Sequence, residues 1–547
     1  MAPICVLPNE LMARILTIYA AETDTLFNLK WSKVMYVGRH WHELARAAQS
    51  LWSFIDLVWH GSYETLYNQL RHSGVAPLTI KLALGEYAQY TDIILDECER
   101  ISSLLVTTRI SYLDVSGTSQ YVYELIGKLP ECRLPILRSL SLDPSYKRDE
   151  LPPNIVEAIP PVLFEGILPS LRELKLKSVA FPLGSLSGLT SISLTECLDI
   201  SAGLPSIASF RGLLEMLGSC PELSTLKLEL TTPEPIPQQS YPTVDLAALT
   251  WLQLREDVTL CTALLKHVRF PPTTSVHVLP SGVFNGMDIR ELLVPLHKHA
   301  RSPGAPALPL LQIDCHPYGT DSRNISYCTM ALFTDTQLHD FLERSQAHCP
   351  FSLNSHPSTE VALRQIVAKV LKAIPGHLIT HLDARNMSYP GEVSWKTILK
   401  LLPALETGYL RVNESAVPCV HALTQIEGLQ QQRENFPRIQ RLQVLIMPHT
   451  KSESENNMVD EFLAALGQYF TVCKGNETPF EVLDIEDPRY ALSQTERQAQ
   501  LERLFPLMGD RLLWNGQVYD PVKRREKLAK RKAEWKALAE KYGLDTE

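Results

Sequence analysis

The chain has 547 residues and a net charge of -9 at neutral pH. It is too long to fold around one compact core, and the acidic balance gives no general reason to expect nucleic-acid binding. Its 11 cysteines are scattered without a C-x-x-C pair, which argues against a disulfide framework and against a zinc site. Polar residues interrupt the apolar N-terminus and no apolar run reaches membrane-spanning length, so we expect a protein of the cytosol, the nucleus or both, with no membrane partner.

Residues 1–60 are expected to form three short helices. Pro8 suits the first turn of a helix because its missing N–H would be unpaired there anyway, and the residues after it share one apolar face: Leu11, Ile15 and Ile18. A second helix is expected after Asp24 as its N-cap, with one apolar side formed by Leu26, Leu29, Val34 and Val37. The third begins at Arg39 and carries Trp41, Leu44, Ala45 and Ala48. A module this small buries little surface, so it needs a partner or the following domain for stability.

This order of residues resembles an F-box, in particular the F-box-like domains common in mushroom-forming fungi. The family's Leu-Pro-x-Glu-Leu start is matched by Leu7, Pro8, Glu10 and Leu11, and its Arg-x-Trp by Arg39 and Trp41. The chain departs from the family pattern at Gly38, where many relatives have Cys, and at Ser50, near which a Pro often lies. The matching residues all fall within the first 60 of the chain.

The resemblance implies that residues 1–60 dock on the small adaptor subunit of SCF-type cullin–RING ubiquitin ligases and, through it, on the cullin. The residues expected to bind this adaptor are Leu7, Pro8, Glu10, Leu11, Ile15, Arg39, Trp41, Leu51 and Trp52. The alternative interpretation is an ordinary N-terminal helical cap, in which the two tryptophans of this set are only core residues.

Residues 61–515 contain a recurring leucine-rich phrase. Its copies end at Leu142, Leu176, Leu194, Leu228 and Leu254, and weaker copies follow in the second half. Each copy looks like a leucine-rich repeat, with helical spacing before several of the strands. We therefore expect an α/β fold in which the three-helix module precedes an irregular leucine-rich-repeat solenoid, with a continuous parallel sheet on its concave face from about residue 75 to 490. The alternatives are a division near Ser302–Pro309 and Ser352–Thr359, or ordinary strands of an α/β sheet.

Strand alternation predicts the recognition surface. In each Leu-x-Leu unit both leucines point into the core, so the residues between and beside them face the concave side. The residues expected to bind a protein substrate are Lys175, Lys177, Lys227, Glu229, Trp251, Gln253 and Arg255. Of these, Trp251 is expected to be an exposed anchor, since Trp and Arg are enriched in binding hot spots; the alternative is that it leans on a neighbouring repeat.

The rest of the sequence contains few motifs with a recognised chemical role. Residues 516–547 carry a basic run, Lys523–Lys532, on a strongly helix-forming segment, which fits nuclear import, RNA contact or a merely solvated helix. No phosphate-binding loop, H-E-x-x-H, G-x-S-x-G or dinucleotide glycine pattern is present, so we expect neither an enzyme nor a cofactor. The predicted function is a substrate receptor of an SCF-type ligase; the alternative is a repeat scaffold whose N-terminal helices only cap the solenoid.

Overall fold

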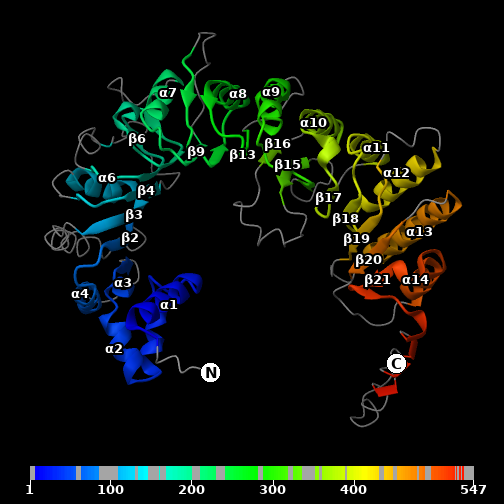
Figure 1. Cartoon of the computed structure of the whole chain (residues 1–547), viewed down its shortest axis with the longest axis horizontal. Coiled ribbons are helices and arrows are strands. Elements are labelled where there is room, and N and C mark those ends of the chain that lie inside the picture. Colours follow the sequence, from blue (N-terminus) through cyan, green and yellow to red (C-terminus); the bar gives the residue numbers. More distant parts are fainter. Residues whose placement is uncertain are drawn as a thin grey trace. The chain divides into compact units, whose positions relative to one another are not determined.

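A computed structural model divides the chain into two units, Met1–Thr274 and Ser275–Glu547 (Figure 1). The division precedes both stretches that the sequence marked as possible boundaries. Both units are mixed α/β, with mostly parallel strands that alternate with helices. The structure describes residues 7–56, 63–84, 109–129, 134–145, 159, 168–199, 210–229, 241–280, 288–317, 325–334, 351–355, 360–387, 391–429, 437–446, 453–476, 480–486, 495–523, 525–526, 529–530 and 533–534.

The first unit begins with a small helical module. It consists of α1 (Asn9–Glu22), the 3-10 helix η2 (Lys30–Tyr36), α2 (Arg39–Ala47) and α3 (Gln49–Trp52). Its core is formed by Met12, Leu16, Ala20, Trp31, Leu44, Ala45, Ala48 and Leu51. The predicted start of the first helix at Pro8 is confirmed, because α1 begins at the next residue with Pro8 as its N-cap.

The prediction of an α-helix capped by Asp24 is wrong. Asp24 has a φ of 51°, a left-handed conformation that does not suit an N-cap, and Leu29 has a φ of 55°. The side chain of Asn28 accepts a hydrogen bond from the Lys30 amide at 3.0 Å. Such local side-chain bonds compete with helix formation, so the segment turns twice before η2 begins.

The sheet of the first unit adds its strands in chain order. Its strands are β1 (Phe54–Asp56), β2 (Leu78–Leu84), β3 (Ile110–Thr118), β4 (Ser139–Ser145), β5 (Glu173–Lys177), β7 (Ser191–Thr195), β9 (Thr225–Glu229) and β11 (Trp251–Leu254). Each pairs in parallel with the next. The other elements are α4 (Tyr63–His72), α6 (Ser119–Lys128), η6 (Leu183–Ser185), α7 (Phe210–Gly218), α8 (Val258–His267) and the short parallel pairs β6 (Ala180–Phe181) with β8 (Leu198–Asp199) and β10 (Val244–Asp245) with β12 (Val268–Arg269).

Alternation along these strands gives the sheet one apolar and one polar face. Neighbouring strands place their leucines and isoleucines in register: Leu113, Leu140, Leu174, Ile192, Leu226 and Leu252 form one such row. All of these side chains are buried. The side chains between them lie on the other face, which confirms the alternation predicted for the Leu-x-Leu units.

The sheet of the second unit has a different strand order. It runs β13 (Ser275–Val278), β16 (Phe351–Ser355), β15 (Ile325–Phe333), β14 (Leu310–Pro317), β17 (His381–Asp383), β18 (Thr407–Arg411), β19 (Arg441–Leu445), β20 (Val482–Glu486), β21 (Leu512–Trp514) and β22 (Gln517–Val518). The helices are α9 (Asp288–Ala300), α10 (Glu360–Ala373), α11 (Glu392–Lys400), α12 (Ala416–Gly428), α13 (Glu453–Gly475) and α14 (Thr495–Met508), with 3-10 helices η8 (Gly376–Leu378) and η10 (Gly509–Arg511).

The expectation of an uninterrupted parallel sheet is wrong in this unit. Strand β15 is antiparallel to both of its neighbours, β14 and β16. Only residues 318–324 separate β14 from β15, whereas a crossover between parallel strands needs a dozen residues or more. The chain can therefore only turn back at this point.

The C-terminal segment is described in part. Between Pro521 and Glu534 the described residues are helical, as the sequence predicted, and Arg525 pairs with Glu502 of α14 at 2.7 Å. Arg524, Lys527, Leu528, Arg531, Lys532 and residues 535–547, which complete the predicted basic helix, lie outside the described residues. Of the helices described, none combines the length and the apolar character needed to cross a membrane.

Candidate binding surfaces

Helix α1 carries an exposed apolar stripe. Leu11, Ile15 and Ile18 are 49%, 44% and 49% exposed. The opposite side, with Met12, Leu16 and Ala20, packs into the core of the module. The sequence prediction of a single apolar face was therefore wrong, because the helix has one face for its own core and a second that is about half exposed.

More apolar side chains are exposed elsewhere in the same module. Leu7 precedes α1 and Tyr19 follows Ile18, while η2, which contacts α1, leads to Tyr36 and Val37, 88% and 68% exposed. Single exposed apolar residues are normal on any protein. Here, however, seven of the sixteen large apolar side chains found exposed among the described residues fall between Leu7 and Val37. Such a concentration is typical of an interaction site.

The other residues predicted to bind an adaptor divide into surface and core. Pro8, Glu10 and Arg39 are exposed, and Arg39 pairs with Glu43 one turn along α2 at 2.9 Å. Trp41 is half-buried and packs against the module core. Leu51 is fully buried in that core, so the expectation that it contacts a partner directly is wrong.

Two tryptophans tie the module together. Trp52 is half-buried, and its Nε1 donates a hydrogen bond to the Ala45 carbonyl at 2.9 Å. Its ring meets that of Trp31 edge-on at 5.1 Å between centroids. Sequence reasoning missed Trp31, although a Trp is the natural core residue in a segment otherwise rich in Lys and Ser. The hydrogen bond holds α3 against α2, and the ring contact holds α3 against the start of η2.

The polar face of the first unit brings most of the predicted substrate-binding residues together. In register across neighbouring strands lie Lys175 of β5, Ser193 of β7, Lys227 of β9 and Gln253 of β11. The adjoining row contains Lys177, Thr195 and Glu229, with Arg255 following β11. The predicted set thus forms one contiguous patch on the sheet.

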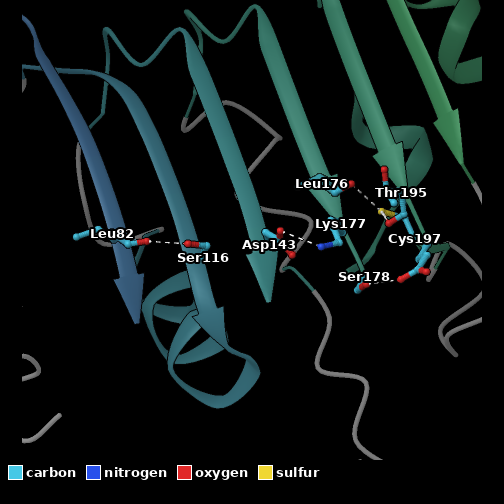
Figure 2. Close-up of polar contacts among 9 residues, drawn as sticks. Leu82, Ser116, Asp143, Leu176, Lys177, Ser178, Thr195 and Cys197 are labelled. Atoms are coloured by element: carbon cyan, nitrogen blue, oxygen red, sulfur yellow. Dashed lines mark hydrogen bonds and ion pairs between the residues drawn. The ribbon is translucent and has the colours of Figure 1, made fainter. Parts of the chain in front are cut away.

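Several of these residues already have ion-pair or cation–π partners. The Lys177 ammonium reaches Asp143 of β4 at 3.1 Å across two neighbouring strands (Figure 2). The Arg255 guanidinium pairs with Glu229 at 3.2 Å. Trp251 is half-buried rather than exposed, with the Lys227 ammonium 6.0 Å from its ring centroid. The expectation of an exposed Trp beside a freely available Arg is therefore corrected.

The turns after β5 and β7 repeat one another. Ser178 and Glu196 each follow the last strand residue and have φ values of 51° and 53°, unusual for residues other than glycine. The Ser178 hydroxyl donates to the Glu196 carboxylate at 2.9 Å. The Cys197 thiol bonds to the carbonyls of Leu176 and Thr195 at 3.4 and 3.3 Å. The two turns thus support each other at the edge of the polar face.

The second unit contains a buried polar cluster that sequence reasoning missed. Gln312 and Asp314 of β14 and Asp383 of β17 are each 2% exposed. Gln312 Nε2 donates to both carboxylate oxygens of Asp314, at 3.3 and 3.1 Å. Arg385 binds Asp383 through two hydrogen bonds of 3.0 Å. The only sequence feature here is polar residues alternating with Leu and Ile in a weak repeat copy, which marks a polar face without showing that it is buried.

Burial and a neighbouring charge change the acidity of this cluster. Desolvation first, and then the negative charge of Asp383, raise the pKa of Asp314 to about 6, against a smaller opposite effect of hydrogen bonds from Gln312 and Asn386. The cluster can hold a proton near neutral pH. Its polar atoms are largely used in contacts with one another, and no set of three or more potential metal ligands occurs among the described residues.

In the same register row as Gln312, three strands away, His277 of β13 lies near a serine. Its Nδ1 is 2.7 Å from the hydroxyl of Ser352, which stands next to it in register on β16. His277 is buried, so this pair joins two strands inside the unit.

Comparison with known proteins adds no relative. No protein-family model matches the sequence, and no curated protein matches it significantly.

Proposed function

We propose that this protein is the substrate-recognition subunit of an SCF-type cullin–RING ubiquitin ligase. In this proposal residues 1–60 are an F-box-like module that binds the ligase adaptor, and through it the cullin. The polar face of the sheet binds a protein substrate. The chain itself catalyses nothing, because other subunits perform the transfer, and it works in the cytosol, the nucleus or both.

The observation that carries the proposal is the exposed stripe on α1. Leu11, Ile15 and Ile18 are about half exposed although the helix already has a complete core face. Covering the exposed half of each side chain would contribute on the order of 1 kcal/mol per residue. A partner that also covers Tyr36 and Val37 would bury more apolar surface.

A recurring turn before the strands supports the second half of the proposal. Before four strands of the first unit the chain makes the same turn, in which a leucine amide donates to the carbonyl three residues earlier. The donors are Leu137, Leu171, Leu223 and Leu249, all buried. Leu405 makes the same turn before β18 in the second unit. A recurring turn, buried leucines and chain-ordered parallel strands favour a leucine-rich-repeat-like solenoid over residues 61–515, broken by the antiparallel β15.

The test is adaptor binding by the full chain. Leu11→Asp together with Ile15→Asp places two carboxylates in the stripe, and each would be buried without a partner in the complex, at a cost of several kcal/mol. We expect this variant to lose adaptor binding in a pull-down with recombinant adaptor, while its thermal unfolding stays unchanged because both side chains face solvent in the free chain.

A matched control uses exposed valines of the second unit. Val294→Asp with Val393→Asp adds the same two charges at positions 64% and 61% exposed, on α9 and α11, and should leave adaptor binding intact. Undiminished binding by the α1 variant would refute the F-box interpretation.

A second candidate is a repeat scaffold in which the module only caps the sheet. Contacts between the module and the first strands favour it: the ring of Phe27 meets Phe54 of β1 edge-on at 5.5 Å, and Lys81 of β2 lies 4.0 Å above the Phe27 ring. Under this alternative the stripe binds no adaptor, so the same pull-down separates the two functions.

A further inference from the structure

The polar face over β5, β7 and β9 has a distinct chemical pattern. Strand β7 presents three hydroxyl side chains in a row, Ser191, Ser193 and Thr195. On either side of the central hydroxyl stand Lys175 of β5 and Lys227 of β9, each in register with Ser193. We call these five residues the hydroxyl–lysine patch.

Only some of the charges in and around the patch have an ion-pair partner. Lys177 is paired with Asp143 and Glu229 with Arg255, so these four charges compensate in two pairs. Among the described residues no carboxylate lies within ion-pairing distance of Lys175 or Lys227. Two ammonium groups without an ion-pair partner among the described residues therefore flank uncharged hydroxyl donors, and the one of Lys227 also lies 6.0 Å from the ring centroid of Trp251.

The spacing of the two ammonium groups indicates the kind of ligand. Adjacent strands lie about 4.8 Å apart, so the backbones at Lys175 and Lys227 are separated by about 10 Å. In an extended peptide, carboxylates two or three residues apart are separated by about 7–10 Å. A phosphoryl group would instead concentrate its charge at one point, and Arg255, whose planar fork suits phosphate best, is held by Glu229.

We propose that the hydroxyl–lysine patch binds an acidic segment of a partner protein, with two Asp or Glu carboxylates on Lys175 and Lys227 and hydrogen bonds from the β7 hydroxyls. The proposal rests on the proposed function, since it specifies the substrate class of the same face. Glu173, exposed on β5 beside Lys175, repels a third carboxylate at that end and so fixes where the acidic residues lie. The chain carries a net charge of -9, so an acidic ligand is attracted only by such a local basic patch.

The experiment measures peptide binding directly, with no ligase subunit present. Fluorescein-labelled hexaglutamate is titrated with the full chain at low salt and followed by fluorescence anisotropy, with hexaglutamine as the uncharged comparison. We expect hexaglutamate to bind, hexaglutamine not to bind, and Lys175→Glu with Lys227→Glu to weaken binding about tenfold or more. Added salt should weaken the wild-type interaction as it screens exposed charges.

The matched control is Lys372→Glu with Lys400→Glu, which changes net charge equally at two exposed helical lysines of the second unit and should bind like the wild type. Equal losses in both double variants, or no loss in either, would overturn the proposal. Tighter binding of a peptide with one phosphoserine and no Asp or Glu, through the same lysines, would also overturn it, in favour of a phosphoryl ligand. Because adaptor binding is measured separately on α1 variants, failure of one proposal is distinguishable from failure of the other.

Discussion

Asp314→Asn should remove a pH dependence from the stability of the second unit. The pKa of Asp314 rises from 3.8 to about 6 on folding, so the folded chain holds a proton that the unfolded chain has released between these two values. The contribution of Asp314 to the free energy of unfolding is therefore fully present below about pH 4 and is lost as the pH rises through 6. The difference of about two between the folded and unfolded pKa values corresponds to about 3 kcal/mol in the free energy of unfolding.

The groups around the carboxyl decide how well Asn replaces it. Gln312 can still donate to the Asn oxygen, and the new amide nitrogen can donate to Asp383, whose charge opposes ionisation of Asp314. Since the variant has no ionisable group there, its free energy of unfolding at pH 7 should equal or exceed that of the wild type. The wild-type loss of stability between pH 4 and 6 should become shallower by about 1.4 kcal/mol per pH unit.

Urea unfolding at half-unit steps from pH 4 to 8, followed by circular dichroism, measures both quantities. Asp484→Asn is the control, since it removes a half-exposed carboxylate from β20 of the same unit. If the free energy of unfolding of Asp314→Asn fell with rising pH as steeply as that of the wild type, this pH dependence would not come from Asp314.

Two further substitutions test the packing. Leu226→Ala, at a site 1% exposed, should lower the free energy of unfolding by about 2–5 kcal/mol in urea denaturation. Lys227→Ala, on the polar face, should leave it nearly unchanged. Equal effects of the two substitutions would contradict the alternation. Gly376→Ala should lower the melting temperature, because the added Cβ would lie 2.5 Å from the Leu401 carbonyl oxygen. Gly428→Ala, with open space at that position, should not lower it. An unchanged melting temperature of Gly376→Ala would show that this close approach is relieved at little cost.

The parts of the fold that the sequence predicted depend on local patterns. Pro8 sets the start of α1, and the Leu-x-Leu period sets which residues of β9 are buried, because both follow from backbone geometry within a few residues. The segment before η2 was mispredicted for a local reason as well. Its apolar spacing suits a helix, but the Asn28 side chain captures a backbone amide and the periodicity does not show this.

The features that were missed depend on contacts distant in sequence. Arg255 was predicted to be available, yet Glu229 neutralises it from the neighbouring strand, 26 residues earlier. Besides burial, the pKa of Asp314 depends on the charges of Asp383 and Arg385, about 70 residues further along the chain. Periodicity places each residue on the correct face of a strand, but only register between strands decides which charges compensate one another.

The antiparallel β15 has a consequence for the order of folding. Strands β14 and β15 are separated by seven residues, 318–324, whereas the parallel pair β17 and β18 is separated by residues 384–406. Closing a short loop loses less chain entropy and brings the strands together sooner. The hairpin also offers a free edge on each side, and β16 and β17 occupy those edges in the finished sheet. We therefore expect the hairpin to be the nucleus of the second unit, and its amides to become protected from hydrogen exchange before those of the parallel strands that follow.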